Sequence, residues 1–182
     1  MAQYNGYVEV PHGSYDAWRS ATLGNGYDVD YAYGDQCWDF CALLYWQYGL
    51  MLKTGDGTAA GCWSIMRNAN AVDPFIAVTG VQNIKRGDIV VLDITPLSFG
   101  GHIAFADEDY DGSGRINLLG QNQMGTGTGA PANVVSFGLS NFLGIFRNTN
   151  WDGSPQPVEE TTVKKRKYPW AVAINHWYNG KR

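Results

Sequence analysis

A cysteine and four acidic residues are crowded into the stretch YDVDYAYGDQCWDF at residues 27–40. A calcium loop of the EF-hand kind takes ligands from positions 1, 3, 5, 7 and 12, with a backbone carbonyl at position 7. Counting from the first aspartate predicts a calcium site made of Asp28, Asp30, Ala32, Gly34 and Asp39. The alanine would offer only its backbone carbonyl. Because the fit is imperfect, a solvated, aspartate-rich turn remains the competing interpretation.

A second acidic segment, DEDYDG at residues 107–112, matches the start of a calcium loop more closely. Its ninth position is the cation Arg115 and its twelfth is Leu118, so neither supplies an anionic ligand. The segment also lies between two β-rich runs, where Asp-Gly-Ser-Gly favours a hairpin turn. We therefore predict a turn here rather than a metal site.

Cys37 is predicted to lie at the N-terminus of a helix, directly after Asp35 and Gln36. The helix dipole and unpaired N–H groups there stabilise a thiolate, and such sites lower a cysteine pKa from about 8.5 to about 3.5–7.5. Nearby carboxylates oppose that shift unless a cation neutralises them. We expect Asp35 to cap the helix. Cys41 and Cys62 have apolar surroundings and are predicted to be core residues.

A thiolate nucleophile needs an imidazole that accepts its proton and later protonates the leaving group. The chain has three histidines. His12 lies near the N-terminus and His176 lies in the tail, whereas His102 starts a β-rich run behind two glycines. His102 is therefore the preferred partner of Cys37.

The imidazole also needs a partner on its other nitrogen, and the hairpin that follows His102 supplies three candidates. A loop with an odd number of residues, centred on Gly112, sets Asn122 opposite His102. A two-residue loop sets Gln123 there instead, with Gln121 as a diagonal neighbour. We prefer the odd loop, and Asn122 with it, and both glutamines remain open as candidates.

The elements that must position these residues follow from the spacing of apolar side chains. Helices are expected at 14–23, with Ser14 as N-cap, at 37–49 and at about 61–69. Strands are expected within 87–95, 100–109, 114–123, 132–139 and 142–147. Helices first and strands afterwards predict an α+β fold in which N-terminal helices pack on one face of an antiparallel sheet.

Composition narrows the class of protein further. With 45% hydrophobic and 16% charged residues the chain can build a core and is not disordered. It has no apolar run of about 18 residues, so no membrane insertion is expected. Residues 1–150 carry seven Lys and Arg against fourteen Asp and Glu, which argues against nucleic acid as a partner. The composition changes near residue 151, which predicts a domain at 1–150 and a linker or tail at 151–182, or the start of a further module.

Several motifs follow one another along the chain: Asp-x-Asp-x-x-Tyr-Gly-x-Gln-Cys-x-Asp at 28–39, Gly-Asp-Ile-Val-Val at 87–91, Gly-His-Ile-Ala at 101–104 and Gln-Asn at 121–122. Over about residues 14–147 this series resembles the CHAP domain, the cysteine, histidine-dependent amidohydrolases/peptidases common in bacteriophage endolysins. The resemblance implies a papain-like α+β fold of the NlpC/P60 type. It also implies Cys37 as nucleophile and His102 as general base and acid.

The resemblance bears on two further parts of the site. In some phage members a calcium loop precedes the cysteine, and its ligands map onto the five positions that the spacing selects. Relatives often place a Glu two residues before the Asn, where this chain has Gly120. The carboxylate that would orient the imidazole is therefore missing, and the third catalytic residue is left open between Asn122 and the glutamines.

Taken together, the residues and the resemblance predict a peptidoglycan hydrolase. Cys37 would attack an amide carbonyl of the wall peptide to form a thioester, and His102 would carry the protons. The Cys37 N–H and Gln36 would stabilise the oxyanion that forms during attack. Gln121 is a further candidate for an oxyanion or orienting residue. An endopeptidase is expected first. An N-acetylmuramoyl-L-alanine amidase would use the same residues, and a calcium-stabilised wall-binding module with an inert Cys37 is the alternative from another class.

Further expectations concern cofactors, partners and location. The resemblance implies a structural Ca²⁺ and no organic cofactor. It also implies that the protein is a monomer whose partner is bacterial peptidoglycan. The N-terminus MAQYNGYVEVPHG lacks a charged-then-apolar export signal. We therefore expect synthesis in the host cytoplasm without a signal peptide, and action at the bacterial cell wall.

Overall fold

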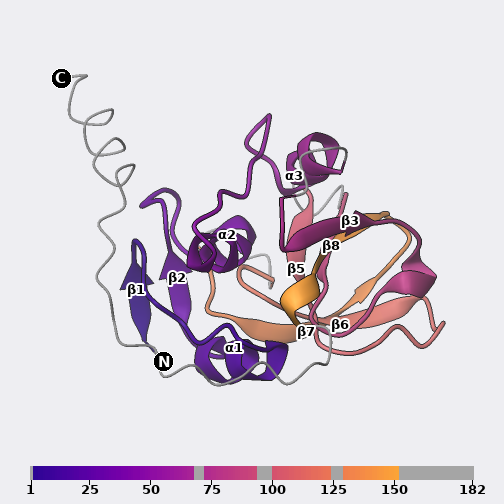
Figure 1. The fold of residues 1–182 in the computed structure, drawn as a ribbon, viewed down its shortest axis with the longest axis horizontal. Helices are drawn as coiled ribbons and strands as arrows, with labels where there is room; N and C mark the ends of the chain where they lie inside the picture. The colour runs from indigo at the N-terminus through magenta and orange to yellow at the C-terminus, as the bar shows by residue number, and fades with distance from the viewer. Residues whose placement is uncertain (1, 68–71, 94–99, 124–128, 152–182) are drawn as a thin grey trace.

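The computed structural model describes residues 2–67, 72–93, 100–123 and 129–151, and three short α-helices lie in the first of these segments (Figure 1). They are α1 (Tyr15–Thr22), α2 (Cys37–Gln47) and α3 (Ala59–Met66). Ser14 caps α1, since its Oγ accepts a hydrogen bond from Ala17 N at 3.1 Å. Thr58 caps α3, so this helix begins two residues before the position expected from the sequence. The other two helices lie where they were predicted.

The cap of α2 differs from the expectation. Gln36 is the N-cap, and its N–H donates to Oδ2 of Asp39 at 3.1 Å. A carboxylate three residues along therefore satisfies the first turn, as in a capping box. The prediction that Asp35 caps this helix is wrong, because its carboxylate instead accepts a hydrogen bond from the side-chain amide of Gln3.

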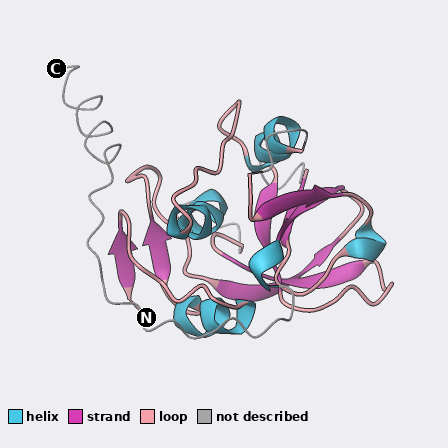
Figure 2. Cartoon of the chain, viewed as in Figure 1, coloured by secondary structure: helices cyan, strands magenta, loops and turns pink. Residues whose placement is uncertain are grey.

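Six strands form an antiparallel sheet in the order β3-β8-β4-β5-β6-β7 (Figures 1 and 2). Each of the five predicted runs contains one strand of this sheet, and β3 was not anticipated. Two further short strands, also unpredicted, pair in parallel beside α2. In chain order the strands are β1 (Gln3–Asn5), β2 (Gly26–Asp28), β3 (Phe75–Val78), β4 (Ile89–Leu92), β5 (His102–Ala106), β6 (Arg115–Gly120), β7 (Asn133–Gly138) and β8 (Phe142–Asn148).

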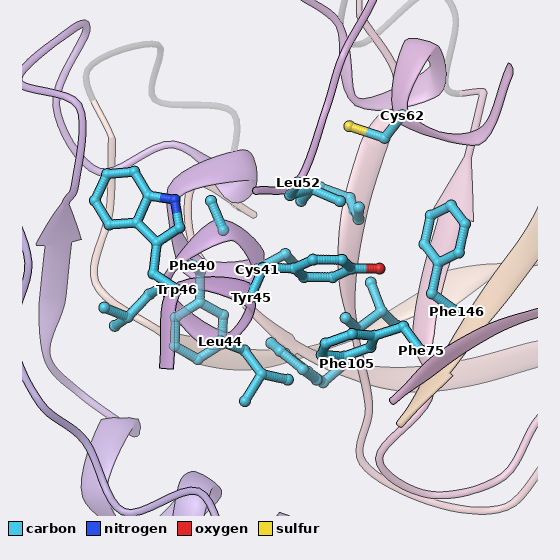
Figure 3. Packing of buried hydrophobic residues seen from close by; sticks show 14 of the residues in the cluster. Phe40, Cys41, Leu44, Tyr45, Trp46, Leu52, Cys62, Phe75, Phe105 and Phe146 are labelled. Carbon is cyan, nitrogen blue, oxygen red and sulfur yellow. The ribbon is translucent and has the colours of Figure 1, made fainter. Parts of the chain in front are cut away.

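The helices pack on one face of the six-stranded sheet and form the main hydrophobic core with it (Figure 3). Tyr45 of α2 stacks on Phe75 of β3, with ring centroids 3.9 Å apart and planes inclined by 9°. Cys41 and Cys62 are fully buried in this core, as predicted. The expected α+β arrangement, with helices on one face of an antiparallel sheet, is confirmed.

Strands β4 and β5 are buried on both faces. On the face away from the main core, their side chains join a second apolar cluster with residues of β6 and β8. This explains why the runs IVVL and HIAFA lack an alternating pattern. His102 begins β5 and is itself 6% exposed, so the imidazole is placed by one of the most buried strands of the protein.

Two short 3₁₀ helices complete the described chain, η1 (Val81–Asn83) and η2 (Thr149–Trp151). Trp151 packs against the body, where its Nε1 donates to the His12 carbonyl at 2.7 Å. Apart from Trp151, the expected linker or tail at 151–182 lies outside the described residues. Within the described segments, no helix combines the length and apolar character that a membrane crossing requires.

The turn before β4 is held by an ion pair that is largely shielded from water. Asp88 is 2% exposed and accepts hydrogen bonds from Nε and Nη2 of Arg147, each at 2.8 Å. It also accepts from the backbone N–H of Lys85 at 2.7 Å. The carboxylate therefore joins β8 to the turn that leads into β4.

We expect Asp88→Ala to lower the free energy of unfolding by about 3 kcal/mol, because the variant removes the carboxylate that faces the Arg147 guanidinium. Urea unfolding measures the loss. Lys85→Ala is the control, since Lys85 Nζ meets Asp109 in an ion pair whose two side chains are each 60% exposed. That variant should lose less than about 1 kcal/mol. Equal losses in both variants would contradict the assignment.

Candidate active site

Cys37 and His102 line the same cleft, which has a volume of about 510 Å³. The cleft lies where the start of α2 meets the start of β5, since α2 packs across this strand. Gln36 and Asn122 also line it, as does Thr58 at the cap of α3. The structure therefore brings together a thiol and an imidazole that lie far apart in the sequence.

The thiol of Cys37 sits on the first residue of α2. Desolvation raises its pKa above the ordinary value, and the negative charge of Asp39 acts in the same direction. The backbone N–H groups of Ile103 and Trp38 oppose the rise. In the free protein, desolvation and the carboxylate of Asp39 therefore outweigh the nearby backbone N–H groups, and the lowering of the thiol pKa expected beside a bound cation remains a prediction.

Two side chains contact the imidazole ring of His102, one at its face and one at its edge. Its ring stacks on Phe137 of β7, with centroids 4.9 Å apart and planes inclined by 15°. Its Nε2 lies 3.1 Å from Oε1 of Gln123. Burial lowers the pKa of His102 to about 4, an effect that the hydrogen bond with Gln123 opposes. Because Nε2 is engaged, Nδ1 is the ring nitrogen left to exchange a proton with a thiol.

The glycine before His102 makes this position possible. Gly101 has φ of +73°, and a Cβ there would lie 2.4 Å from the carbonyl oxygen of Leu92 on β4. A side chain would therefore push β5 away from β4 at the point where the imidazole enters the cleft.

The hairpin after His102 has the predicted register but not the predicted contact. Phe105 pairs with Leu119, as the odd loop requires. However, β6 ends at Gly120, and Asn122 adopts a left-handed conformation with φ of +51°. The chain thus turns away before it reaches the position opposite His102, and the hydrogen bond to the ring comes from Gln123 instead of Asn122.

Asn122 contributes to the cleft through Gln36. Its Nδ2 donates to Oε1 of Gln36 at 2.8 Å, and Nε2 of Gln36 donates in turn to the carbonyl of Tyr33 at 2.7 Å. Among the described residues, Oδ1 of Asn122 is buried and has no hydrogen-bond partner. The catalytic role of Asn122 remains a prediction, and its observed contact is with the N-cap of α2.

Gln121 is fully buried and joins three segments of the site. Its Oε1 accepts from Tyr27 N at 2.8 Å, and its Nε2 donates to the carbonyls of Tyr27 and Gln36 at 2.9 and 3.1 Å. Both amide protons therefore have backbone acceptors. This geometry suits a residue that positions β2 and the start of α2 more than one that donates to an oxyanion.

The three aspartates predicted as metal ligands converge. One carboxylate oxygen each from Asp28, Asp30 and Asp39 lies within 4.8 Å of the others. Ca²⁺ binds oxygens at 2.3–2.6 Å, so two ligands of one ion lie at most about 5 Å apart. Ala32 N–H donates to Oδ1 of Asp28 and of Asp30 at 3.1 and 2.8 Å, which wraps the loop around the carboxylates. Carbonyl ligation by Ala32 and Gly34 remains a prediction.

The charges of this cluster favour a bound cation. Burial, and then the negative charge of Asp30, raise the pKa of Asp39 to about 7. Burial, and then the charge of Asp28, also raise the pKa of Asp30. A hard divalent cation would remove this repulsion and prefers oxygen ligands. The residues present therefore fit calcium.

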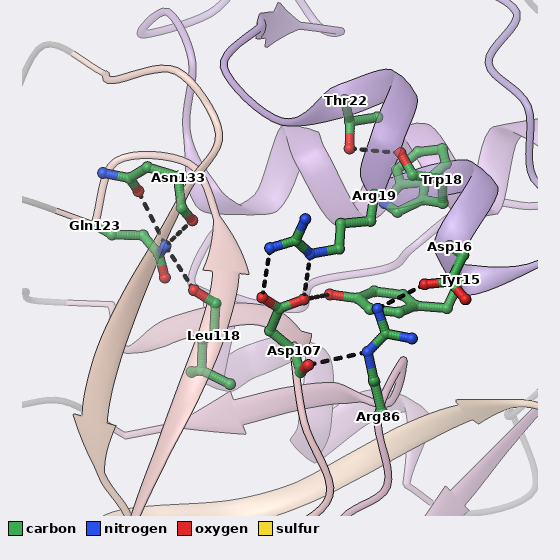
Figure 4. A network of polar contacts seen from close by, with 10 residues as sticks. All are labelled: Tyr15, Asp16, Trp18, Arg19, Thr22, Arg86, Asp107, Leu118, Gln123 and Asn133. Carbon is green, nitrogen blue, oxygen red and sulfur yellow. Dashed lines mark hydrogen bonds and ion pairs between the residues drawn. The ribbon is translucent and has the colours of Figure 1, made fainter.

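The second acidic segment is a turn, as predicted (Figure 4). Asp107 accepts from Nε and Nη2 of Arg19 at 2.6 and 2.9 Å and from the Tyr15 hydroxyl at 2.9 Å. Asp111 accepts from Ser113 N at 2.8 Å within the turn between β5 and β6. These carboxylates are engaged by protein donors and do not converge on one point.

The sequence model of the CHAP domain matches residues 26–122, from β2 to the turn that carries Asn122. The chain therefore belongs to the CHAP domain family. It is also 31% identical over 164 residues to the D-alanyl-L-alanine endopeptidase of Streptococcus phage B30. That match covers 85% of this chain and 34% of the phage protein, so the chain spans about a third of the length of this relative.

A comparison with solved structures gives the same fold. The crystal structure of the wild-type endolysin LysIME-EF1 aligns with a TM-score of 0.62 at 21% sequence identity. The alignment covers 76% of this chain and 63% of that one. Together with the helices on one face of the antiparallel sheet, it supports the papain-like fold that the sequence predicted.

The buried imidazole makes a specific prediction about stability and pH. Between about pH 6.5 and pH 4 the unfolded chain carries a proton on His102 that the folded protein does not. The free energy of unfolding of the wild type should therefore fall as the pH is lowered through this window. Relative to His102→Asn, we expect the wild type to lose about 3 kcal/mol.

Urea unfolding of both proteins at a series of pH values measures this difference. Other groups titrate in both proteins, so the difference between the two curves isolates His102. A difference that stays constant from pH 7 to pH 4 would show that the imidazole titrates normally in the folded protein.

Proposed function

We propose that this chain is a peptidoglycan hydrolase that cleaves an amide bond of the bacterial wall peptide through a thioester on Cys37. The observation that carries the proposal is the meeting of Cys37 and His102 in one cleft of a CHAP domain. The phage B30 relative is named a D-alanyl-L-alanine endopeptidase, which favours an endopeptidase over an amidase.

Both reacting groups start uncharged, because burial raises the pKa of the Cys37 thiol and lowers that of His102. As the sulfur attacks the substrate carbonyl, its proton passes to Nδ1 of His102. The imidazolium that forms lies beside the negatively charged tetrahedral adduct, so each charge stabilises the other in a site with little water.

The oxyanion of that adduct would lie at the N-terminus of α2. The Cys37 N–H is one donor there, since the first N–H groups of a helix have no intrahelical partner. The Gln36 side chain is the second, because one of its amide protons goes to Tyr33 and the other has no acceptor among the described residues. The contact between Asn122 and Oε1 of Gln36 keeps this amide in position.

The same imidazole completes the reaction. The His102 imidazolium gives its proton to the leaving amine as the carbon–nitrogen bond breaks, which leaves a thioester on Cys37. Water then attacks the thioester carbonyl and passes a proton to His102, which returns it to the departing sulfur. The products are a carboxylic acid and an amine, and the enzyme is restored.

Cys37→Ala and His102→Ala should each reduce lysis of bacterial walls by at least about a thousandfold, because each removes a group that takes part in bond breaking. The measurement is the fall in turbidity of a wall suspension, with circular dichroism to show that each variant is folded. Cys62→Ala is the matched control, since this cysteine lies in the core. Lysis that survives either active-site change would refute the mechanism.

Mass spectrometry of the digested walls identifies the bond. An endopeptidase leaves the first residue of the stem peptide on the sugar, whereas an amidase releases the whole stem peptide. If the wild type and Cys37→Ala both bind walls and neither releases a fragment, the alternative of a non-catalytic wall-binding module is supported.

We also propose that the cluster of Asp28, Asp30 and Asp39 binds a structural calcium ion. Its support is the convergence of three carboxylates together with the raised pKa of Asp39. When bound, the ion would supply positive charge that holds the loop before α2 in one conformation. Asp39 also accepts from the N–H groups of Val29 and Gln36, so the same carboxylate orders the start of the helix.

Calcium at a hundred times its dissociation constant should stabilise the fold by about 2.7 kcal/mol, which corresponds to a rise of about 5–10 °C in Tm. Calorimetry with calcium and with a chelator measures the shift. Asp28→Asn and Asp30→Asn should remove it, because each variant loses a charged ligand. Asp111→Asn, in the turn after β5, should keep it. If calcium does not change the Tm of the wild type, the calcium site is excluded.

A further inference from the structure

The side-chain amide of Gln123 can be oriented in one way only (Figure 4). Its nitrogen is surrounded by three acceptors, the carbonyl of Leu118 at 3.0 Å and the backbone and side-chain oxygens of Asn133 at 2.6 and 3.0 Å. An oxygen in that place would face three other oxygens. The Gln123 oxygen must therefore be the atom that lies 3.1 Å from Nε2 of His102.

This orientation selects the tautomer of His102. The Gln123 oxygen has no proton to give, so Nε2 of the imidazole carries the hydrogen and donates it. In the neutral ring Nδ1 then has the free lone pair. That is the nitrogen that must accept a proton if the ring serves as a base for Cys37.

Gly120 leaves the room that the Gln123 side chain occupies. A Cβ at Gly120 would lie 2.7 Å from Cβ of Ala104 and 3.2 Å from Oε1 of Gln123. Gly120 itself has no side chain that could reach the imidazole. Since β6 ends here, the chain turns and the Gln123 side chain folds back over the end of the strand, where its amide bonds to Leu118.

We propose that Gln123 is the residue that positions the His102 imidazole, holding it as the Nε2–H tautomer with Nδ1 open to the cleft. Its effect on the reaction rate rests on the function proposed above, whereas its effect on the ring does not. Asn122, which the strand register favours, contacts Gln36 and has no such effect.

The neutral amide orients the ring without adding a negative charge beside it. The titratable groups that line the cleft with His102 are Cys37 and Asp39 of α2 and Asp30 and Tyr33 of the preceding loop. The contacts with the ring from the turn after β6 and from β7 come from Gln123 and Phe137, neither of which titrates. A carboxylate in place of the amide would therefore be a new charge at the edge of the ring.

The test is nitrogen NMR of the His102 ring in the full chain. In the wild type, Nε2 should appear as the protonated nitrogen and Nδ1 as the bare one. Q123L, similar in size, should convert His102 to a mixture of tautomers and lower kcat for lysis by about tenfold or more with little change in KM. Q123E should raise the pKa of His102 by at least about one unit, because its carboxylate adds a negative charge at the edge of the ring.

N122A is the matched control, and its His102 ring should show the wild-type tautomer. A folded Q123L protein that keeps the wild-type tautomer would overturn the proposal, and so would a wild-type protein in which Nδ1 of His102 carries the proton. If the tautomer depends on Gln123 but the wild type releases no wall fragments, the proposed function fails and the positioning role stands. If lysis requires Cys37 and His102 but Q123L changes neither tautomer nor rate, the function stands and the positioning role fails.

Discussion

The amide of Gln121 has no contact with solvent, so its polar atoms must find partners inside the protein. It finds them on two distant segments, at both backbone groups of Tyr27 and at the carbonyl of Gln36. The end of β6 is thereby tied to β2, which leads into the acidic loop, and to the N-cap of α2. Cys37, the acidic cluster and the turn that carries Gln123 all start from this junction.

The acidic loop and Cys37 form one structural unit. Asp39 belongs to the carboxylate cluster, accepts hydrogen bonds from two backbone groups of the loop and its cap, and lies two residues after Cys37. Its negative charge is one of the causes that raise the pKa of the Cys37 thiol. A cation held by the proposed calcium site would therefore both order the start of α2 and weaken the field that disfavours the thiolate.

The imidazole lies among neutral groups. Phe137 covers one face of His102, and the amide of Gln123 meets its edge, so the ring is oriented without a negative partner. Burial then favours the neutral imidazole, just as it favours the neutral Cys37 thiol. The arrangement suits a reaction in which the proton moves during attack, because a standing thiolate–imidazolium pair would have to overcome the desolvation of both groups.

The sequence by itself predicted the three helices, the runs that hold five of the eight strands described, and the pairing of Cys37 with His102. Those features depend on local patterns and on how few cysteines and histidines the chain has, which singled out Cys37 and His102. It also gave the correct register of the hairpin after His102, yet it chose Asn122 over Gln123 because it assumed that β6 continues to that position. Only the tertiary structure showed where β6 ends and that Asp35 bonds to β1 instead of capping α2. The thiol pKa likewise follows from the packing of α2 on β5, since desolvation depends on neighbours that are distant in the sequence.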